Sequence, residues 1–262
     1  IKVIKYLKII IYFKVWIKSK NIKNYINDNN KLSIPKDSKS LKFPKNTLIG
    51  MNNLIIHCRK IYSDQKENLK VSYVPPYKPL IGFFEKGSIS DDQKNMIKPI
   101  LKFASQPLLM NTIADYLKSI PTIVTVNLLY SEAMKKHQKA SNAQKYHSDM
   151  LDPSLLHLII PINDITKETG PFTFIDVKTS KKIIKEIKHQ TGRIADDLVM
   201  KYAKQENINK LVGKAGDAWI MSPYHSIHMG SRVEKGFRLM LIISYASPLH
   251  AIEHVNYFHR KK

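Results

Sequence analysis

Cysteine, acidic residues and long apolar runs are all in short supply in this sequence. Cys58 is the only cysteine, which excludes an intrachain disulfide framework and favours a reducing, cytoplasmic compartment. The apolar core of the first twenty residues, Ile9–Phe13, is far shorter than the ~20 residues that a membrane-spanning helix needs. That region also lacks a small-residue cleavage site, so a secretory signal is not expected.

The shortage of acidic residues leaves a strongly basic chain. Asp and Glu number 21 against 43 Lys and Arg, which gives a net charge of +22. Such a field could attract nucleic acid, acidic lipid or an anionic substrate. Arginine, whose planar fork suits phosphate and base recognition, is rare, so most of the positive charge is lysine. This composition disfavours a dedicated role in nucleic-acid binding.

The chain is expected to divide into a basic N-terminal extension and linker, residues 1–46, and a single domain, residues 47–262. The lysines of residues 1–20 do not gather on one helical face. This favours a peripheral helix or strand packed on the domain over a contact with a membrane surface. Residues 21–46 are rich in Asn, Lys and Ser and contain two prolines, which predicts a loop.

Helical and strand-like patterns divide near Pro121. Residues 88–116 carry apolar residues at helical spacing, and Pro107 predicts a break into a second helix. After Pro121 the pattern changes, because residues 122–130 and 155–164 are apolar and rich in β-branched side chains. Both of these runs are predicted to be buried strands.

The segment Tyr146-His147-Ser148-Asp149 carries the clearest chemistry. In an extended strand, residues two apart point to the same face, so His147 and Asp149 could reach one metal ion together. A histidine from elsewhere in the fold would complete a set of two imidazoles and one carboxylate, which is typical of non-haem iron sites with open coordination positions. His225 and His228 are the main candidates for that third ligand. His157 is a rival, although it stands among apolar neighbours, as a core histidine would.

A lone arginine, Arg238, lies near the start of an apolar strand-like run, residues 237–245. A buried arginine needs an anionic partner, since an unpaired buried charge is very costly. Further turns, Gly170-Pro171-Phe172 and Gly216-Asp217, lie between the His-x-Asp pair and His228.

The full order of these motifs is His147-x-Asp149, Gly170-Pro171-Phe172, Gly216-Asp217, His228-x-Gly230-Ser231 and Arg238. This order resembles the phytanoyl-CoA dioxygenase (PhyH)-like family of Fe(II)/2-oxoglutarate-dependent oxygenases. The resembling part runs from about residue 121 to residue 248. It implies a mainly β fold with flanking helices (α+β), built on a double-stranded β-helix (a cupin-like jelly roll) over about residues 121–248.

The resemblance also implies roles for individual residues. His147, Asp149 and His228 would be the metal ligands and catalytic residues, because the family places Gly and Ser just after the ligand histidine and Arg about ten residues later. Arg238 would bind the far carboxylate of 2-oxoglutarate, with Gln144 and Ser231 as further cofactor-binding residues. His225 would then be a neighbouring pocket residue.

The implied cofactors are Fe(II), 2-oxoglutarate as co-substrate, and O2. The implied reaction hydroxylates a small organic or lipid-like substrate and releases succinate and CO2. The carboxylate of Asp149 favours hydroxylation over halogenation, which needs a small residue at that position. Phytanoyl-CoA itself is not implied, since Lys118 and Tyr146 replace a glycine and a tryptophan that the family often has. The alternative is a non-catalytic jelly-roll module that binds an anionic glycan, lipid surface or nucleic acid without needing iron.

Overall fold

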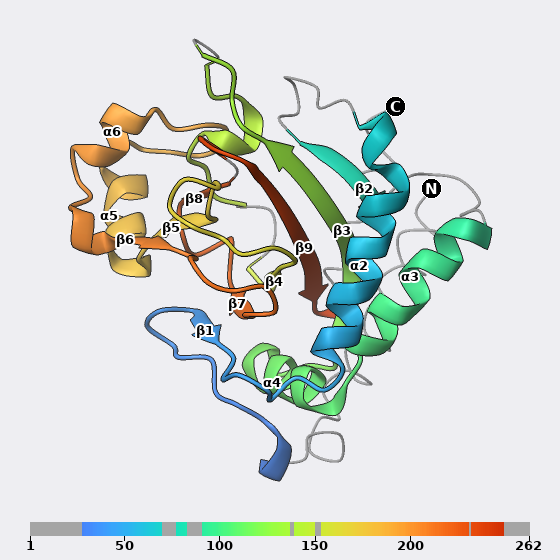
Figure 1. Ribbon diagram of the computed structural model, residues 1–262. Coiled ribbons are helices and arrows are strands. Elements are labelled where there is room, and N and C mark those ends of the chain that lie inside the picture. Colours follow the sequence, from blue (N-terminus) through green and yellow to red (C-terminus); the bar gives the residue numbers. More distant parts are fainter. Residues whose placement is uncertain are drawn as a thin grey trace, which may run out of the picture.

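The computed structural model describes residues 28–69, 77–82, 91–136, 139–149, 153–230 and 232–248. Two expectations fall outside these residues: the peripheral helix or strand near the N-terminus, and the cofactor contact of Ser231. No helix in the described ranges is long and apolar enough to cross a membrane. The described chain is mainly β-sheet with a few flanking helices (Figure 1).

The larger sheet has six strands in the order β1-β7-β4-β9-β3-β2, and every neighbouring pair is antiparallel. Its strands are β1 (Ser40–Lys42), β2 (Lys78–Gly82), β3 (Thr122–Glu132), β4 (Leu156–Pro161), β7 (Trp219–Met221) and β9 (Phe237–Ala246). The two longest strands, β3 and β9, pair along nearly their whole length. They form the frame against which the rest of the fold packs.

The smaller sheet has three antiparallel strands. In this sheet β5 (Thr173–Ile175) lies between β6 (Ile208–Lys210) and β8 (His228–Met229). The two sheets face each other through one buried apolar cluster, whose members are Ile159, Ile165, Phe172, Phe174, Leu211, Trp219, Met221 and Met240. We call the side of the large sheet that carries this cluster its inner face.

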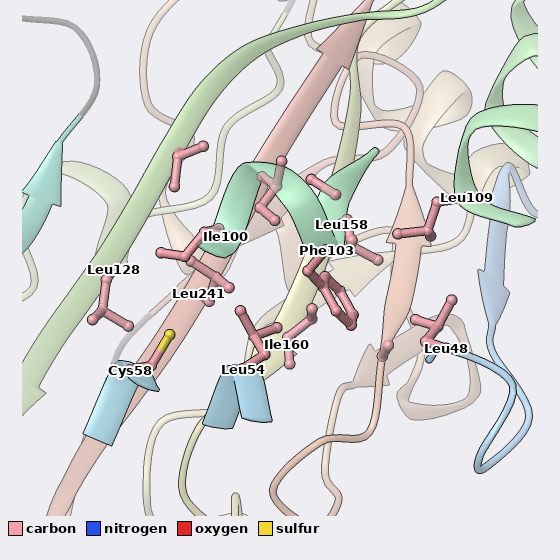
Figure 2. Close-up of a cluster of buried hydrophobic side chains, with 14 of the residues drawn as sticks. Leu48, Leu54, Cys58, Ile100, Phe103, Leu109, Leu128, Leu158, Ile160 and Leu241 are labelled. Atoms are coloured by element: carbon pink, nitrogen blue, oxygen red, sulfur yellow. The ribbon is translucent and has the colours of Figure 1, made fainter. Parts of the chain in front are cut away.

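Helices cover the outer face of the large sheet. These are α2 (Met51–Gln65), α3 (Asp91–Ala104) and α4 (Pro107–Leu117). Figure 2 shows how Leu54 and Cys58 of α2 and Ile100 of α3 meet Leu128 of β3 and Leu241 of β9. Most of the apolar burial therefore lies on the outer face, and this burial stabilises the sheet from one side.

Two further helices, α5 (Val177–Glu186) and α6 (Asp196–Met200), lie beside the smaller sheet (Figure 1). They share a separate apolar cluster with β5, with Tyr146 and with Ile227. Four short 3₁₀ turns complete the described elements: Asp28–Asn30, Lys66–Asn68, Asn142–Gln144 (η4) and Gln205–Asn207. The apolar cluster that α5 and α6 share with β5, Tyr146 and Ile227 holds these segments together beside the smaller sheet.

Strand alternation decides which residues of β9 reach the space between the sheets. Leu239 and Leu241 belong to the outer cluster with the helices. Because successive side chains of a strand point to opposite faces, Arg238, Met240 and Ser244 point to the inner face. Met240 is indeed part of the cluster between the sheets. Arg238 and Ser244 are thus buried polar residues of an otherwise apolar strand.

Several sequence-based expectations are confirmed. The break at Pro107 separates α3 from α4. The runs 122–130 and 155–164 become β3 and β4. The reason is that these patterns are long and uniform enough for local preference and burial to agree.

Two expectations differ from the structure. Part of residues 28–46, expected to be a loop or linker, forms the edge strand β1, and Ile34 and Phe43 are buried in the outer core. The His-x-Asp segment does not lie in a continuous strand, because only Tyr146 and His147 make isolated bridges. In both places the backbone partners come from distant parts of the chain, which a local pattern does not reveal.

Candidate metal centre

Backbone pairing brings two of the candidate ligands together. The His147 N–H donates to the His228 carbonyl at 2.9 Å, and the His228 N–H donates to the His147 carbonyl at 2.7 Å. Paired residues of antiparallel strands project to the same face, and the two imidazole ring centroids lie 4.3 Å apart. Asp149, held by a 3.1 Å bond from its N–H to the Pro223 carbonyl, completes the group.

The three side chains each offer one ligand atom, and these atoms lie within 4.8 Å of one another. The Nε2 atom of His147 is 3.8 Å from Asp149 Oδ1, and the Nε2 atom of His228 is 4.0 Å from Asp149 Oδ2. His225, His157 and the other described histidines do not belong to this group. We refer to His147, Asp149 and His228 as the three-residue group; it could hold a metal ion.

The tautomers of both histidines suit metal binding. Nδ1 of His147 lies 2.9 Å from the Lys145 carbonyl, and Nδ1 of His228 lies 2.9 Å from the Ser226 carbonyl. A carbonyl only accepts hydrogen bonds, so each Nδ1 carries the proton and each Nε2 keeps a free lone pair. Both Nε2 atoms lie near the Asp149 carboxylate, at 3.8 Å for His147 and 4.0 Å for His228. Such backbone contacts orient metal-binding histidines in general.

Burial sets the charge of the group. It lowers the pKa of His147 to about 3, with a smaller contribution from His228, and it also lowers the pKa of His228. Burial alone would raise the pKa of Asp149, but hydrogen bonding from His157 and the electrostatic influence of His228 outweigh it and hold the pKa below 3.8. At neutral pH the group therefore consists of two neutral imidazoles and one carboxylate, which is the protonation state that binds metal.

Arg238 is buried on the inner face without an acidic partner. Arg238 is 3% exposed, and burial lowers the pKa of its guanidinium group to about 10. Nη1 donates to the Gly170 carbonyl at 3.0 Å, whereas Nε has no hydrogen-bond partner in the part of the chain that the structure describes. No carboxylate of the described residues pairs with it. A buried guanidinium in this state has unused capacity for an anion.

Ser131 lies beside Arg238 and was missed by the sequence analysis. It is the direct partner of Arg238 in the register of β3 and β9, and it shares the inner face. Ser131 is fully buried, and its Oγ has no hydrogen-bond partner among the described residues. Two neighbouring buried donors are thus unsatisfied, which fits a carboxylate group placed between them.

A glycine holds the backbone that anchors Arg238. Gly170 has a φ of +74°, and a Cβ there would lie 2.8 Å from Val233 Cγ2 and 2.9 Å from the Val233 nitrogen. Only glycine fits this position, both for its conformation and for its space. The structural role of the Gly-Pro motif is therefore to place the Gly170 carbonyl where it accepts the hydrogen bond from Arg238.

The remaining candidates lie outside the three-residue group. The Gln144 side chain accepts a 3.0 Å hydrogen bond from the Ser141 N–H, which caps the turn η4. His225 Nδ1 lies 2.7 Å from Ser222 Oγ. His157 contacts the group without belonging to it, since its Nε2 lies 3.5 Å from Asp149 Oδ2. A possible contact of Gln144 with 2-oxoglutarate stays a prediction.

Arg193 is a further residue that sequence reasoning did not single out. The bridge between Tyr146 and Ile194 places Arg193 opposite His147, on the face that carries the metal-group side chains. Its charge contributes to lowering the pKa of both His147 and His228. The side chain is exposed, and no carboxylate of the described residues forms an ion pair with it.

Comparison with known proteins gives a fold relationship and no sequence relationship. No family model matches, and no curated protein matches. Among solved structures, EctD from S. alaskensis with bound Fe has a TM-score of 0.55 at 13% identity, covering 85% of this chain and 77% of that one. The epimerase SnoN in complex with Fe3+, alpha ketoglutarate and nogalamycin RO has a TM-score of 0.52 at 13% identity, covering 81% and 80%.

The non-heme alpha ketoglutarate dependent carbocyclase SnoK has a TM-score of 0.51 at 10% identity, covering 87% of this chain and 86% of that one. At such low identities the likeness concerns the fold alone. The chain therefore shares its fold with EctD, SnoN and SnoK, of which SnoN is named an epimerase and SnoK a carbocyclase.

Proposed function

We propose that this protein is an Fe(II)/2-oxoglutarate-dependent oxygenase of the PhyH-like type, with a jelly-roll core at about residues 121–248. His147, Asp149 and His228 are its metal ligands and catalytic residues. The observation that carries the proposal is Arg238, a buried arginine that no carboxylate of the described residues pairs with. It lies on the inner face of the sheet pair that holds the three-residue group. A metal site alone would leave this arginine unexplained.

The residues fit both cofactors. Two Nε2 lone pairs and one carboxylate on one side of an ion leave other coordination positions open, as in non-haem iron oxygenases. Arg238 and Ser131 would receive the far carboxylate of 2-oxoglutarate through charge-assisted and hydroxyl hydrogen bonds. The bound cofactors supply oxidative decarboxylation of 2-oxoglutarate to succinate and CO2, coupled to hydroxylation of the substrate.

The protein's own contribution is orientation and exclusion of water. The Lys145 and Ser226 carbonyls hold the two imidazole rings, and the Gly170 carbonyl holds Arg238. The apolar cluster between the sheets would exclude water from the bound cofactors. Because Asp149 supplies a carboxylate, no position is left for a halide in its place, which favours hydroxylation.

The substrate of this oxygenase is a small organic or lipid-like molecule that carries an anionic group. Arg193 supports this assignment, because it is an exposed cation on the face of the metal ligands. The net charge of +22 would also attract an anionic substrate to the protein.

Anaerobic binding of 2-oxoglutarate to the Fe(II)-loaded protein tests the proposal through the visible charge-transfer band of the chelate. We expect the band in the wild type and its loss in His228→Ala. Arg238→Ala should weaken 2-oxoglutarate binding by about 10- to 100-fold, since a hydrogen bond to a charged group contributes about 1.5–3 kcal/mol. His225→Ala is the matched control and should keep the band.

Absence of the band in folded, iron-supplied wild type would refute the oxygenase proposal. The remaining candidate would then be a non-catalytic binding module for an anionic partner. Such a module predicts that His147→Ala leaves partner binding intact.

A further inference from the structure

A chain of polar side chains crosses the inner face of the large sheet and ends at Asp149. It begins at Asn127 and Thr125 on β3, passes through Ser244 on β9, and reaches His157 on β4. Thr125 and Ser244 are direct cross-strand partners, and so are Ser244 and His157. The strand register therefore places Thr125, Ser244 and His157 in one row, with Asn127 two residues along β3 from Thr125. No part of the proposed binding of 2-oxoglutarate uses them.

The distances along the row are short. Asn127 Nδ2 donates to Thr125 Oγ1 at 3.3 Å, and Thr125 Oγ1 donates to Ser244 Oγ at 2.6 Å. Ser244 Oγ lies 2.9 Å from His157 Nδ1. Beyond the ring, His157 Nε2 lies 3.5 Å from Asp149 Oδ2.

The row fixes the tautomer of His157. Ser244 Oγ accepts a hydrogen bond from Thr125 Oγ1, and its own hydroxyl hydrogen is available to be donated to His157 Nδ1. An imidazole that accepts at Nδ1 carries its proton on Nε2. That Nε2–H faces the carboxylate of Asp149. The ionised carboxylate accepts hydrogen bonds only, so both ends of the ring agree on this tautomer.

The histidines of the centre thus fall into two kinds according to what each Nδ1 meets. In His147 and His228 a carbonyl accepts from Nδ1, so Nε2 is a free lone pair for a metal ion. In His157 a hydroxyl donates to Nδ1, so Nε2 is a donor. His157 is therefore unsuited to bind metal in this state and suited to hold a carboxylate.

Asp149 is the member of the three-residue group whose side chain is least restrained by burial. Its side chain is 35% exposed, compared with 10% for His147 and 4% for His228. Of the three histidines with a ring nitrogen within 4.0 Å of its carboxylate, His157 is the nearest. A carboxylate left to rotate would have to be ordered each time a metal ion binds, at a cost in side-chain entropy.

We propose that His157 is a positioning residue for Asp149, aligned by the hydroxyl row of Ser244 and Thr125. It holds the carboxylate turned toward the two ligand histidines, and so raises the affinity of the centre for a divalent metal. This inference deepens the proposed function and rests on its assignment of Asp149 as a ligand. Outer contacts of this kind typically change metal affinity by about 10- to 100-fold.

The test is a titration of the metal-free protein with Co(II), whose visible spectrum reports both affinity and coordination. We expect His157→Ala to weaken Co(II) binding by about 10- to 100-fold and to alter the spectrum. His157→Gln, whose amide N–H can donate to Asp149, should recover most of the affinity. Ser244→Ala should give a smaller loss, because it frees the tautomer of His157 while leaving the ring in place.

Two comparisons separate positioning from a structural role. His225→Ala removes a histidine that is hydrogen-bonded to Ser222 and does not contact Asp149, so it should leave Co(II) affinity unchanged. Denaturant unfolding of each metal-free variant measures stability independently. A His157→Ala protein that is less stable but binds Co(II) as the wild type does would overturn the proposal. If that variant does not fold, equal Co(II) affinity in Ser244→Ala and wild type would overturn it as well.

The outcomes also distinguish this proposal from the proposed function. Wild type that binds Co(II) but shows no Fe(II)/2-oxoglutarate band would refute the oxygenase, while the His157 comparison would still be decided by the Co(II) titration. Wild type that binds neither would refute both. A normal band and Co(II) affinity in His157→Ala would refute only the positioning role.

Discussion

At the scale of single residues, the centre is determined by what each polar atom meets. The same side chain, histidine, becomes a lone-pair donor at position 147 and an N–H donor at position 157, because a carbonyl lies beside one Nδ1 and a hydroxyl beside the other. Sequence spacing brought His147, Asp149 and Arg238 to attention, but these partners come from other strands or from the local backbone conformation. The role of His157 could not be foreseen from its apolar neighbours.

Burial of neutral His147 predicts acid sensitivity of the metal-free protein. Its pKa is about 3 in the folded state against an ordinary 6.5, so between these values the unfolded chain binds the extra proton. The contribution of neutral His147 to the free energy of unfolding is therefore fully present above pH ~6.5. It falls as the pH decreases below that value, by about 1.4 kcal/mol per pH unit. Denaturant unfolding in the presence of a chelator measures the slope. His147→Asn should reduce it, and a flat profile for wild type would contradict the assignment.

Ser131→Ala should change stability and cofactor binding in opposite directions. The Oγ is buried without a partner, so its removal should leave the metal-free protein as stable as wild type or more stable by up to about 1 kcal/mol. If Ser131 helps Arg238 to bind the far carboxylate, 2-oxoglutarate affinity should fall about three- to tenfold. Unfolding curves and the anaerobic titration measure the two effects. Unchanged affinity would show that Arg238 binds without its neighbour.

Gly170→Ala should weaken the anchoring of Arg238. The new Cβ would clash with Val233, and the strained φ of +74° adds about 1–2 kcal/mol. Gly236 has the same φ of +74° with no atom within 4 Å of a Cβ, so Gly236→Ala is the matched control for backbone strain alone. We expect Gly170→Ala to lose more stability than the control and to lose 2-oxoglutarate affinity as well. Equal effects of the two substitutions would contradict the proposed role of the close contact.

At the scale of elements, long uniform patterns were predictable and short paired segments were not. The strands β3 and β4 and the separation of α3 from α4 follow from local preference and proline chemistry. The strands β1 and β8, of three and two residues, exist only because a distant strand pairs with them. The predicted strand ended at residue 130, whereas β3 continues to Glu132 and carries Ser131 opposite Arg238.

The reactivity of the Cys58 thiol reports whether α2 stays packed against the large sheet. Its side chain is fully buried against the large sheet (Figure 2), and burial raises its pKa to about 12. A thiol that is neither exposed nor ionised should not react with a disulfide reagent in the native protein. We expect labelling only as denaturant unfolds the chain, with the same midpoint as the loss of far-UV signal. Rapid labelling without denaturant would show that α2 detaches on its own.

At the scale of the whole molecule, the outer face carries most of the apolar packing and the inner face carries the chemistry. The helices α2, α3 and α4 stabilise the large sheet from outside, so its inner face can hold buried polar residues such as Arg238 and Ser131. Unsatisfied buried groups cost stability, and the outer core offsets that cost. The net charge of +22 adds a long-range field to this arrangement.

This field predicts a salt-dependent association of 2-oxoglutarate, if the proposed function holds. A dianion approaching a strongly positive protein is steered toward it, and the steering weakens as the Debye length falls from ~30 Å at ~0.01 M salt to ~8 Å at ~0.15 M. We expect the association rate to fall about tenfold over this range, with little change in the dissociation rate, which is governed by short-range contacts such as that of Arg238. Anaerobic stopped-flow measurement of the charge-transfer band gives both rates. Arg193→Gln should reduce the salt dependence if this cation lies at the entrance, whereas an association rate independent of salt would show that the positive charge does not act on the co-substrate.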